Sequence, residues 1–340
     1  MSKIGILTFH FADNYGAVLQ CLALQEKCKE LGCDVEIINY KPYQMITWKS
    51  RVKQLVHKSP QQRLFQSFRD NHFIMSTNRS KFDCVVVGSD QVWNPSIIGF
   101  DDYWFSPKEN HGHICSYAAS FGKSSLNTEE LSFLKKQTEI LSKYDTIAVR
   151  EETGKSILYK LGIDSVKVCD PTLLFYDHAD FYRLLSARSR LRSEKKLQEG
   201  YILVYSLEKS DPIDFHSQKI KAEIGLPVVS LHPMNGRTQD CDMFINDTDP
   251  YDFLWLIEHC TYMITNSFHG LAFSYIFKKK VYCVGHSSLS SRQTELIRKS
   301  DFIFNKTSDN VTIVDCNQSS LSFQEYIDNS LKILTNVTQK

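Results

Sequence analysis

The sequence lacks several features that would point to whole classes of protein. Its 340 residues carry a formal net charge of only +1 at pH 7, which argues against bulk electrostatic binding of nucleic acid. No apolar run is long enough to span a bilayer, and no signal peptide is recognisable. We therefore expect a cytoplasmic protein with no nucleic-acid partner and no transmembrane segment, which contacts a membrane only peripherally, through its substrate.

Cysteine pairs at metal-binding or redox spacing are also missing. The ten cysteines are scattered, with no C-x-x-C pair, and most stand in apolar segments such as 84–87 and 281–284. This distribution predicts buried, reduced thiols and gives no support to a zinc site. The segment Asp247-Thr248-Asp249 resembles a metal-binding D-x-D motif, but Asp249 precedes Pro250, a pair typical of a helix start. We assign no metal.

Short apolar strands and amphipathic helices alternate along the chain, and this order is its main structural signal. Strands are expected at residues 3–9, 35–40, 84–87, 114–118, 146–149, 166–169, 201–206, 228–231, 262–265 and 281–284. Helices are expected at residues 17–31, 129–144, 151–161, 250–260, directly after His269, at 319–334 and, in part, over 44–71. Such alternation indicates an α/β protein with parallel, doubly wound sheets.

A basic segment poor in large apolar residues, 186–200, marks a domain boundary. We predict a Rossmann-like domain over residues 1–190, a second over 200–318, and a helix within 319–340 that packs back on the first domain. Two doubly wound domains that face a cleft bind ligands at the carboxyl ends of their strands. The candidate site residues should therefore lie in loops that follow strands.

The most informative of these loops runs from Thr265 to Gly270 and joins a strand to a helix. A helix amino terminus favours an anion, so Gly270 and its neighbours form a candidate anion site. Asn266 and Ser267 can add side-chain donors, and His269 can deliver a proton near neutral pH. In the alternative interpretation, Ser267 or Asn266 caps the helix and His269 packs against the sheet.

Three further loops hold polar residues directly after strands: Asn14-Tyr15-Gly16, Ser89-Asp90-Gln91 with Asn94, and Arg150. Each has a structural alternative. Glycine permits tight turns, Asp90 and Asn94 can cap local backbone, and Arg150 can form a surface ion pair with Glu151 or Glu152. Their joint placement at strand ends favours a functional site.

Six groups of residues, in order along the chain, resemble the polysaccharide pyruvyl transferase family. They are KIGILTFH with NYGAVLQ (3–10 and 14–20), VGSDQVWN (87–94), SYAASFG (116–122), VRE (149–151), DPTLL (170–174) and TNSFHG (265–270). The resemblance implies two Rossmann-like domains arranged as in B-type glycosyltransferases. It also implies transfer of a pyruvyl group from phosphoenolpyruvate, a co-substrate with no further cofactor, onto two hydroxyls of a sugar as a cyclic ketal. The implied setting is capsular or exopolysaccharide biosynthesis, with a saccharide acceptor that is free or lipid-linked.

The resemblance carries His269 over as the general acid and Arg150 as a donor ligand. Relatives have an arginine two residues before the histidine, where this chain has Ser267. We therefore propose Arg292 as a replacement cation for the doubly anionic donor. The chemistry of the acceptor suggests Asp90 as the group that orients or deprotonates its hydroxyl. Asn14, Tyr15, Gly16, Ser89, Gln91 and Asn94 complete the predicted acceptor side.

Two other classes of function remain open. A B-type glycosyltransferase would share the architecture, but it needs a base-stacking and ribose-binding site that the sequence does not reveal. A non-catalytic sugar- or anion-binding relative is the second, and in it Ser267 would reflect lost chemistry. The identity of the donor distinguishes a glycosyltransferase from a pyruvyl transferase. Turnover distinguishes the non-catalytic relative, which would bind phosphoenolpyruvate without releasing phosphate.

Overall fold

The computed structural model describes residues 1–41, 59–77, 79–108, 111–198, 200–207, 211–231, 241–285, 291–300, 304–306, 311–316 and 321–339. The chain divides into two units, each with its own sheet. Unit 1 consists of Met1–Asp13, Ala17–Leu174 and Glu325–Lys340. Unit 2 consists of Asn14–Gly16 and Phe175–Gln324. Residues 175–190, which the sequence assigns to the first domain, thus group with unit 2.

Unit 1 contains a six-stranded sheet in the order β2-β1-β3-β4-β5-β6, with every neighbouring pair parallel. Its strands are β1 (Lys3–Leu7), β2 (Asp34–Ile37), β3 (Phe82–Val87), β4 (His111–Ala119), β5 (Thr146–Val149) and β6 (Val166–Lys167). Its helices are α1 (Tyr15–Glu30), α3 (Pro60–His72), α4 (Pro95–Ile98), α5 (Thr128–Lys136), α6 (Thr138–Leu141) and α7 (Glu152–Tyr159), with short 3₁₀ turns at Asp102–Trp104 and Pro171–Phe175. Helix α1 belongs to unit 1 only from Ala17 onward. The last helix, α13 (Leu321–Thr338), contributes its residues from Glu325 onward.

Burial on both faces explains why the strands of unit 1 read as apolar runs rather than as an alternating pattern. Val85, Val86 and Val87 of β3 are all fully buried, as expected for a parallel sheet covered by helices. The carboxyl-terminal part of α13 covers part of this sheet. Ser330 accepts through its hydroxyl from the backbone amide of Cys169 (2.9 Å) and through its carbonyl from the hydroxyl of Tyr117 (3.4 Å).

Unit 2 contains a seven-stranded sheet in the order β12-β13-β11-β10-β7-β8-β9. The strands are β7 (Ile202–Tyr205), β8 (Val228–Leu231), β9 (Met243–Ile245), β10 (Tyr262–Thr265), β11 (Lys280–Val284), β12 (Phe304–Lys306) and β13 (Val311–Asp315). The helices are α8 (Asp180–Ser186), α9 (Asp211–Ile224), α10 (Pro250–His259), α11 (Phe268–Ile276) and α12 (Ser291–Ser300), with 3₁₀ turns at Arg190–Ser193 and Lys195–Leu197. β13 runs antiparallel to both β11 and β12, whereas the other pairs are parallel.

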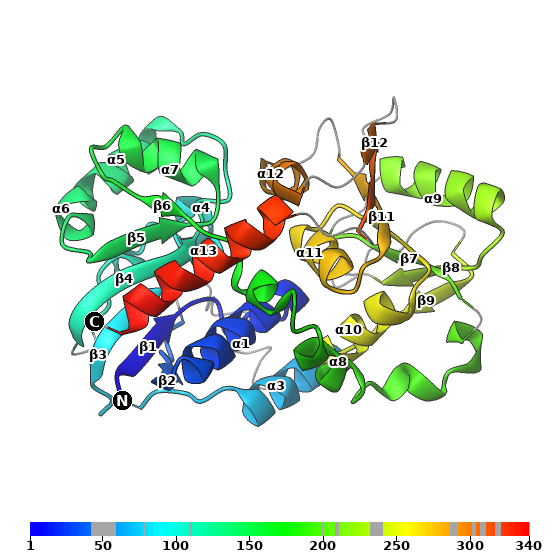
Figure 1. Cartoon of the computed structure of the whole chain (residues 1–340), viewed down its shortest axis with the longest axis horizontal. Coiled ribbons are helices and arrows are strands. Elements are labelled where there is room, and N and C mark those ends of the chain that lie inside the picture. The colour runs from blue at the N-terminus through cyan, green and yellow to red at the C-terminus, as the bar shows by residue number, and fades with distance from the viewer. Residues whose placement is uncertain are drawn as a thin grey trace. The chain divides into compact units, whose positions relative to one another are not determined.

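Helices cover both faces of the unit 2 sheet (Figure 1). Ile202, Val204 and Ile264 point to the face where α9 packs, in one apolar cluster with Ile213 and Ile220. The alternate residues of β7 and β10 face α10 and α11, because strand side chains alternate between faces. This second face is the one that carries the candidate site in unit 2.

Most of the predicted elements are confirmed, and one was wrong. The expected doubly wound α/β class is confirmed, and β5, β8 and β10 have the predicted bounds. The helix expected over 129–144 is instead two helices that meet at Gln137, whose buried amide donates to Asp102 Oδ1 (2.6 Å). The backbone N–H of Gln137 donates to the Leu134 carbonyl, three residues back (2.9 Å), as is common where a helix ends. Of the segment 44–71, which was predicted to be helical in part, residues 44–58 lie outside the described residues and most of the rest belongs to α3.

The expectations for cysteines and membrane spans can also be compared with the structure. Nine of the ten cysteines are buried and all are unbridged, which confirms the prediction of reduced, apolar thiols. Burial raises the pKa of the Cys169 thiol to about 12, so that it stays protonated and unreactive at neutral pH. Within the described part of the chain, no helix combines the length and apolar character needed to cross a membrane.

Candidate active site

His269 lies in the first turn of α11, directly after β10. Ser267 is the N-cap of this nine-residue helix, and its hydroxyl accepts a hydrogen bond from Gly270 N at 3.3 Å. The capping interpretation of Ser267 is therefore confirmed. The positive end of the helix dipole lies at this point, which favours a negatively charged ligand beside His269.

The segment Asn14–Gly16, in which α1 begins at Tyr15, belongs to the same unit as His269. Gly16 lies against the imidazole so closely that an added Cβ would stand 2.1 Å from Nδ1 and 2.4 Å from Cγ of His269. Only glycine fits at this position without displacing the ring. The starts of α1 and α11, about 250 residues apart in the sequence, thus meet at one imidazole, which is itself only 8% exposed.

Tyr15 anchors this segment in unit 2. Its ring stacks on Phe253 of α10 with centroids 4.6 Å apart and an interplanar angle of 2°, and it meets Tyr205 edge-on. Its hydroxyl forms a short hydrogen bond with the hydroxyl of Thr248. Tyr15 is fully buried, so we interpret it as the residue that holds Gly16 against His269 rather than as a direct acceptor contact.

Gly270, the residue after His269, is packed just as closely. A Cβ at Gly270 would lie 2.6 Å from Thr265 Oγ1 and 3.1 Å from the Tyr205 ring, so Gly270 allows α11 to approach the ends of β10 and β7. Burial raises the pKa of the Tyr205 hydroxyl well above its usual range, and a hydrogen bond with Ser267 opposes that shift only in part. Asn266 accepts a hydrogen bond from Leu207 N at 3.1 Å, which joins the loops after the same two strands.

A second group of predicted residues meets in unit 1, around Arg150. Its guanidinium lies 2.7 Å from Asp170, 3.2 Å from Glu151 and 3.8 Å from Asp90. The Arg150 side chain is only 2% exposed, so the alternative of a surface ion pair was wrong, although Glu151 is one of the partners. Burial alone would lower the pKa of Arg150, but the nearby carboxylates outweigh burial and raise it.

This cluster joins the motifs at residues 87–94, 116–122, 149–151 and 170–174, which lie at the carboxyl ends of β3, β4, β5 and β6. Ser120 donates to Glu151 Oε1 (2.6 Å), and the Thr172 hydroxyl donates to Asp170 Oδ1 (2.8 Å). Three carboxylates surround the one guanidinium, so Arg150 brings no uncompensated positive charge. Its assignment as a donor ligand stays a prediction.

Asp90 is the most exposed of the three carboxylates, with 13% of its side chain accessible. It has a left-handed backbone (φ 74°), which aspartate tolerates better than most residues. Its Oδ1 accepts from the amide of Gln91 at 2.8 Å, so the local cap expected as the alternative is present. A role toward the acceptor hydroxyl stays a prediction.

The neighbouring predicted residues hold the loop after β3 together. Ser89 donates to Gln20 Oε1, and its carbonyl accepts from the Thr8 hydroxyl (2.8 Å), which ties this loop to β1 and α1. Asn94 caps α4 through Ser96 N (3.2 Å), as its structural alternative predicted, and donates to Gln91 Oε1 (3.0 Å). These contacts assign a scaffold role to each of them.

The remaining predictions concern Arg292 and the D-x-D segment. Arg292 lies in α12, but its side chain is outside the described residues. Asp249 caps α10 in a capping box with Asp252, which confirms its interpretation as a helix cap. Burial, and then the charge of Asp252, raise the Asp249 pKa to about 6. Among the described residues, no three His, Cys, Asp or Glu side chains are grouped to hold a metal ion.

Sequence reasoning missed Tyr205, Phe253 and Asp170 as members of these two clusters. Tyr205 and Asp170 follow or end a strand, so their position at a sheet edge was a usable signal. Phe253 gave none, because a helical aromatic residue looks the same whether it packs on a strand or on a loop from elsewhere in the chain.

Comparisons with known proteins agree with this architecture. A family model described as polysaccharide pyruvyl transferase matches residues 14–288. No curated protein matches the chain.

Several solved structures are similar in fold. UDP-GlcNAc 2-epimerase from Neisseria meningitidis bound to UDP-GlcNAc has 10% identity and a TM-score of 0.54, covering 99% of each chain. The S. aureus MnaA-UDP co-structure has 12% identity and a TM-score of 0.53, covering 99% of this chain and 92% of that one. UDP-N-acetylglucosamine 2-epimerase from Rickettsia bellii has 10% identity and a TM-score of 0.50, covering 100% and 96%. At such identities the likeness concerns the fold alone, two Rossmann-like domains of the glycosyltransferase B type.

Proposed function

The chain belongs to the polysaccharide pyruvyl transferase family, and from this premise we propose that it moves the pyruvyl group of phosphoenolpyruvate onto a saccharide. Two hydroxyls of the acceptor become the oxygens of a cyclic ketal, and inorganic phosphate is released. We place the reaction in the cytoplasm, in the synthesis of a capsular polysaccharide or exopolysaccharide, with an acceptor that is free or lipid-linked. No further cofactor is proposed.

The observation that carries this proposal is the contact between Gly16 and His269. Both residues lie in motifs that resemble the family, and the matched region 14–288 includes both. An imidazole fixed at the start of α11 combines a proton donor with a helix end that favours an anion. This pairing supports a reaction in which an anionic substrate must be protonated.

The proposed chemistry begins with the methylene carbon of phosphoenolpyruvate. His269 donates a proton to that carbon, the adjacent carbon becomes electrophilic, and an acceptor hydroxyl adds to it. The carbon–oxygen bond to phosphate then breaks, the phosphate leaves with the bonding electrons, and a second hydroxyl closes the ring. One of the two hydroxyl protons restores the proton that His269 gave to the methylene carbon, and the other is taken up by the departing phosphate. Asp90 is proposed to orient or accept the proton of the acceptor hydroxyl.

The donor's charge still requires compensation. Arg150 is already surrounded by three carboxylates, so the α11 dipole is the main positive feature described beside His269. We propose Arg292 as the additional cation. Asn266, Ser267 and Gly270, at the start of α11, are proposed to contact the donor as well.

Two measurements test the proposal. Calorimetry should detect binding of phosphoenolpyruvate in preference to UDP-GlcNAc, the ligand of one of the similar epimerase structures. Phosphate release should depend on an acceptor from a panel of galactose-, glucose- and mannosamine-type sugars, with mass spectrometry of the acceptor showing the added ketal. Binding of the nucleotide sugar without binding of phosphoenolpyruvate would favour a glycosyltransferase. Binding of phosphoenolpyruvate without turnover on any acceptor would favour a non-catalytic relative.

A further inference from the structure

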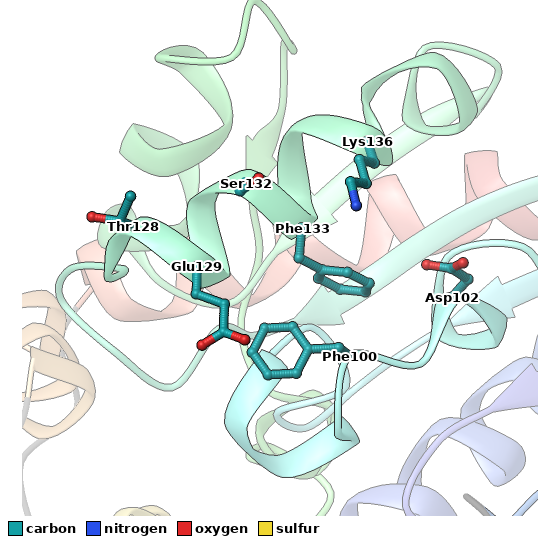
Figure 2. Close-up of a pocket in the computed structure, with 7 residues that line it drawn as sticks. All are labelled: Phe100, Asp102, Thr128, Glu129, Ser132, Phe133 and Lys136. Carbon is teal, nitrogen blue, oxygen red and sulfur yellow. The ribbon is translucent and has the colours of Figure 1, made fainter.

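An open cavity of about 660 Å³ lies on unit 1, between α5 and the turn that follows α4 (Figure 2). Its volume is within the range of about 300–1,000 Å³ that is usual for small-molecule sites. The rings of Phe100 and Phe133 form its apolar part. Asp102, Thr128, Glu129, Ser132 and Lys136 supply polar groups around the rings. None of the residues proposed above for the chemistry lines this cavity.

Phe100 is held in an unusual conformation at the mouth of the cavity. It has a left-handed backbone with φ 59°, immediately after Gly99 with φ 67°. A bulky side chain in this region costs roughly 1–2 kcal/mol, and glycine would avoid that cost. Such strain is concentrated at ligand sites. Phe100 nevertheless remains 37% exposed as a residue, and its ring meets that of Phe133 edge-to-face with centroids 5.4 Å apart.

The polar groups indicate the class of ligand. Asp102 and Glu129 carry two negative charges and Lys136 one positive charge, so the lining has a formal charge of −1. An anion such as phosphoenolpyruvate is therefore disfavoured here. Gln137 donates to Asp102 Oδ1 at 2.6 Å and fixes the orientation of that carboxylate. A partly exposed phenyl ring beside carboxylates, hydroxyls and an ammonium group fits a sugar ring, which offers an apolar C–H face and several hydroxyls.

We propose that this cavity binds a neutral sugar residue of the saccharide acceptor, other than the residue that receives the pyruvyl group. The identification of that sugar as part of the acceptor rests on the proposed function. Binding itself does not, because it requires neither donor nor turnover. The cavity would select for extended acceptors over single sugars.

The first test measures binding in the absence of phosphoenolpyruvate. The full chain is titrated by calorimetry with neutral oligosaccharides built from galactose, glucose or N-acetylmannosamine. We expect saturable binding of at least one of them and at least a tenfold loss of affinity in Phe100→Gly. That variant removes the ring but also relieves the backbone strain. Its affinity should therefore fall while its stability, measured as the urea midpoint, does not. Phe100→Tyr should retain binding, and Lys136→Met, a change at an exposed residue, should weaken it.

A matched control is Tyr159→Ala, which removes a 77% exposed aromatic ring of unit 1 outside the cavity and should leave binding unchanged. If turnover is observed, Phe100→Gly should raise the KM for the oligosaccharide with little change in kcat, and leave both constants unchanged for a single-sugar acceptor. Oligosaccharide binding without any turnover would support the sugar site while the proposed function fails. Absence of binding to every oligosaccharide, or wild-type affinity in Phe100→Gly, would overturn the inference.

Discussion

Gly16→Ala tests the placement of His269 most directly. The added Cβ would stand 2.1 Å from Nδ1, whereas ordinary contact begins at 3.4 Å. The imidazole, or the start of α1 that carries residue 16, must therefore move by about 1.3 Å. Tyr15 is buried and stacked on Phe253, which restrains the start of α1, so we expect most of the movement to fall on the imidazole.

The magnitude follows from what His269 is proposed to do. A misplacement of about 1 Å can lower a rate by roughly 100-fold, and the whole contribution of a general acid is about 10²–10⁴-fold. We therefore expect kcat to fall by roughly 100-fold. Overpacking of this kind also lowers the free energy of unfolding by about 1–3 kcal/mol, which is small enough for the protein to remain folded in the assay.

The assay is phosphate release under saturating donor, with a urea titration of each variant. Gly154→Ala in α7 is the matched control, because its Cβ would meet Phe121 at 3.4 Å and Val149 at 3.5 Å. It should keep wild-type kcat, and alanine should stabilise the helix by roughly 0.5–1 kcal/mol.

A double-mutant cycle separates the local effect from general damage. If Gly16 acts through the imidazole, Gly16→Ala should have no further effect on kcat in a His269→Ala background. Wild-type kcat in the single variant would refute the reasoning. So would a full additional loss in the double variant, because Gly16 would then act independently of His269.

Three further predictions concern single residues. His269→Gln should lower turnover by about 10²–10⁴-fold while the Kd for phosphoenolpyruvate, measured by calorimetry, stays within a few-fold of wild type; an unchanged rate would reduce His269 to a packing residue. Arg150→Gln should lower the free energy of unfolding by roughly 3–5 kcal/mol, since it leaves buried carboxylates uncompensated, whereas Arg183→Gln, which breaks exposed ion pairs, should cost no more than about 1 kcal/mol in the same urea titration. The Asp249 pKa of about 6 lies above its ordinary value of 3.8, so the folded state holds the carboxyl proton more tightly than the unfolded state does. The stability that this proton contributes, up to about 3 kcal/mol, is therefore lost as pH rises from about 4 through 6. Asp249→Asn keeps a capping oxygen and should flatten that part of a plot of the free energy of unfolding, from urea titrations, against pH; an unaltered slope would contradict the assignment.

Local patterns were sufficient to predict the parallel core strands. The apolar run of β10 between turn residues has the same bounds in the sequence prediction and in the structure. The antiparallel strand β13 was not predicted, although its run of β-branched residues at 311–314 is typical of a strand; its antiparallel pairing with β11 is the part that no local pattern reveals. The break between α5 and α6 at Gln137 was not predicted either, and the bond from the Gln137 amide to Asp102 joins residues too far apart in sequence for local propensity to reveal.

The candidate site divides in the same way. Position at strand ends suggested His269, Arg150 and Asp90 as candidates, since parallel strands bring their carboxyl ends to one edge. Local contacts such as the caps made by Ser267 and Asn94 were predicted, whereas contacts between segments distant in sequence were not. The residue type of Arg150 suggested an anion clamp, but its three carboxylate partners come from separate loops. The contact between Gly16 and His269 also depends on the tertiary fold, since a glycine near a helix start equally suits a tight turn with no close neighbour.

The membership of Asn14–Gly16 in unit 2 has a consequence for recombination between family members. A chimera made with one crossover near residue 175 would combine the Tyr15 segment of one parent with the Phe253 stack and the histidine of the other. Parents that differ at these contacts would then give an inactive hybrid even though each half is intact. A chimera designed to exchange acceptor or donor specificity should therefore take Asn14–Gly16 from the same parent as the carboxyl-terminal half.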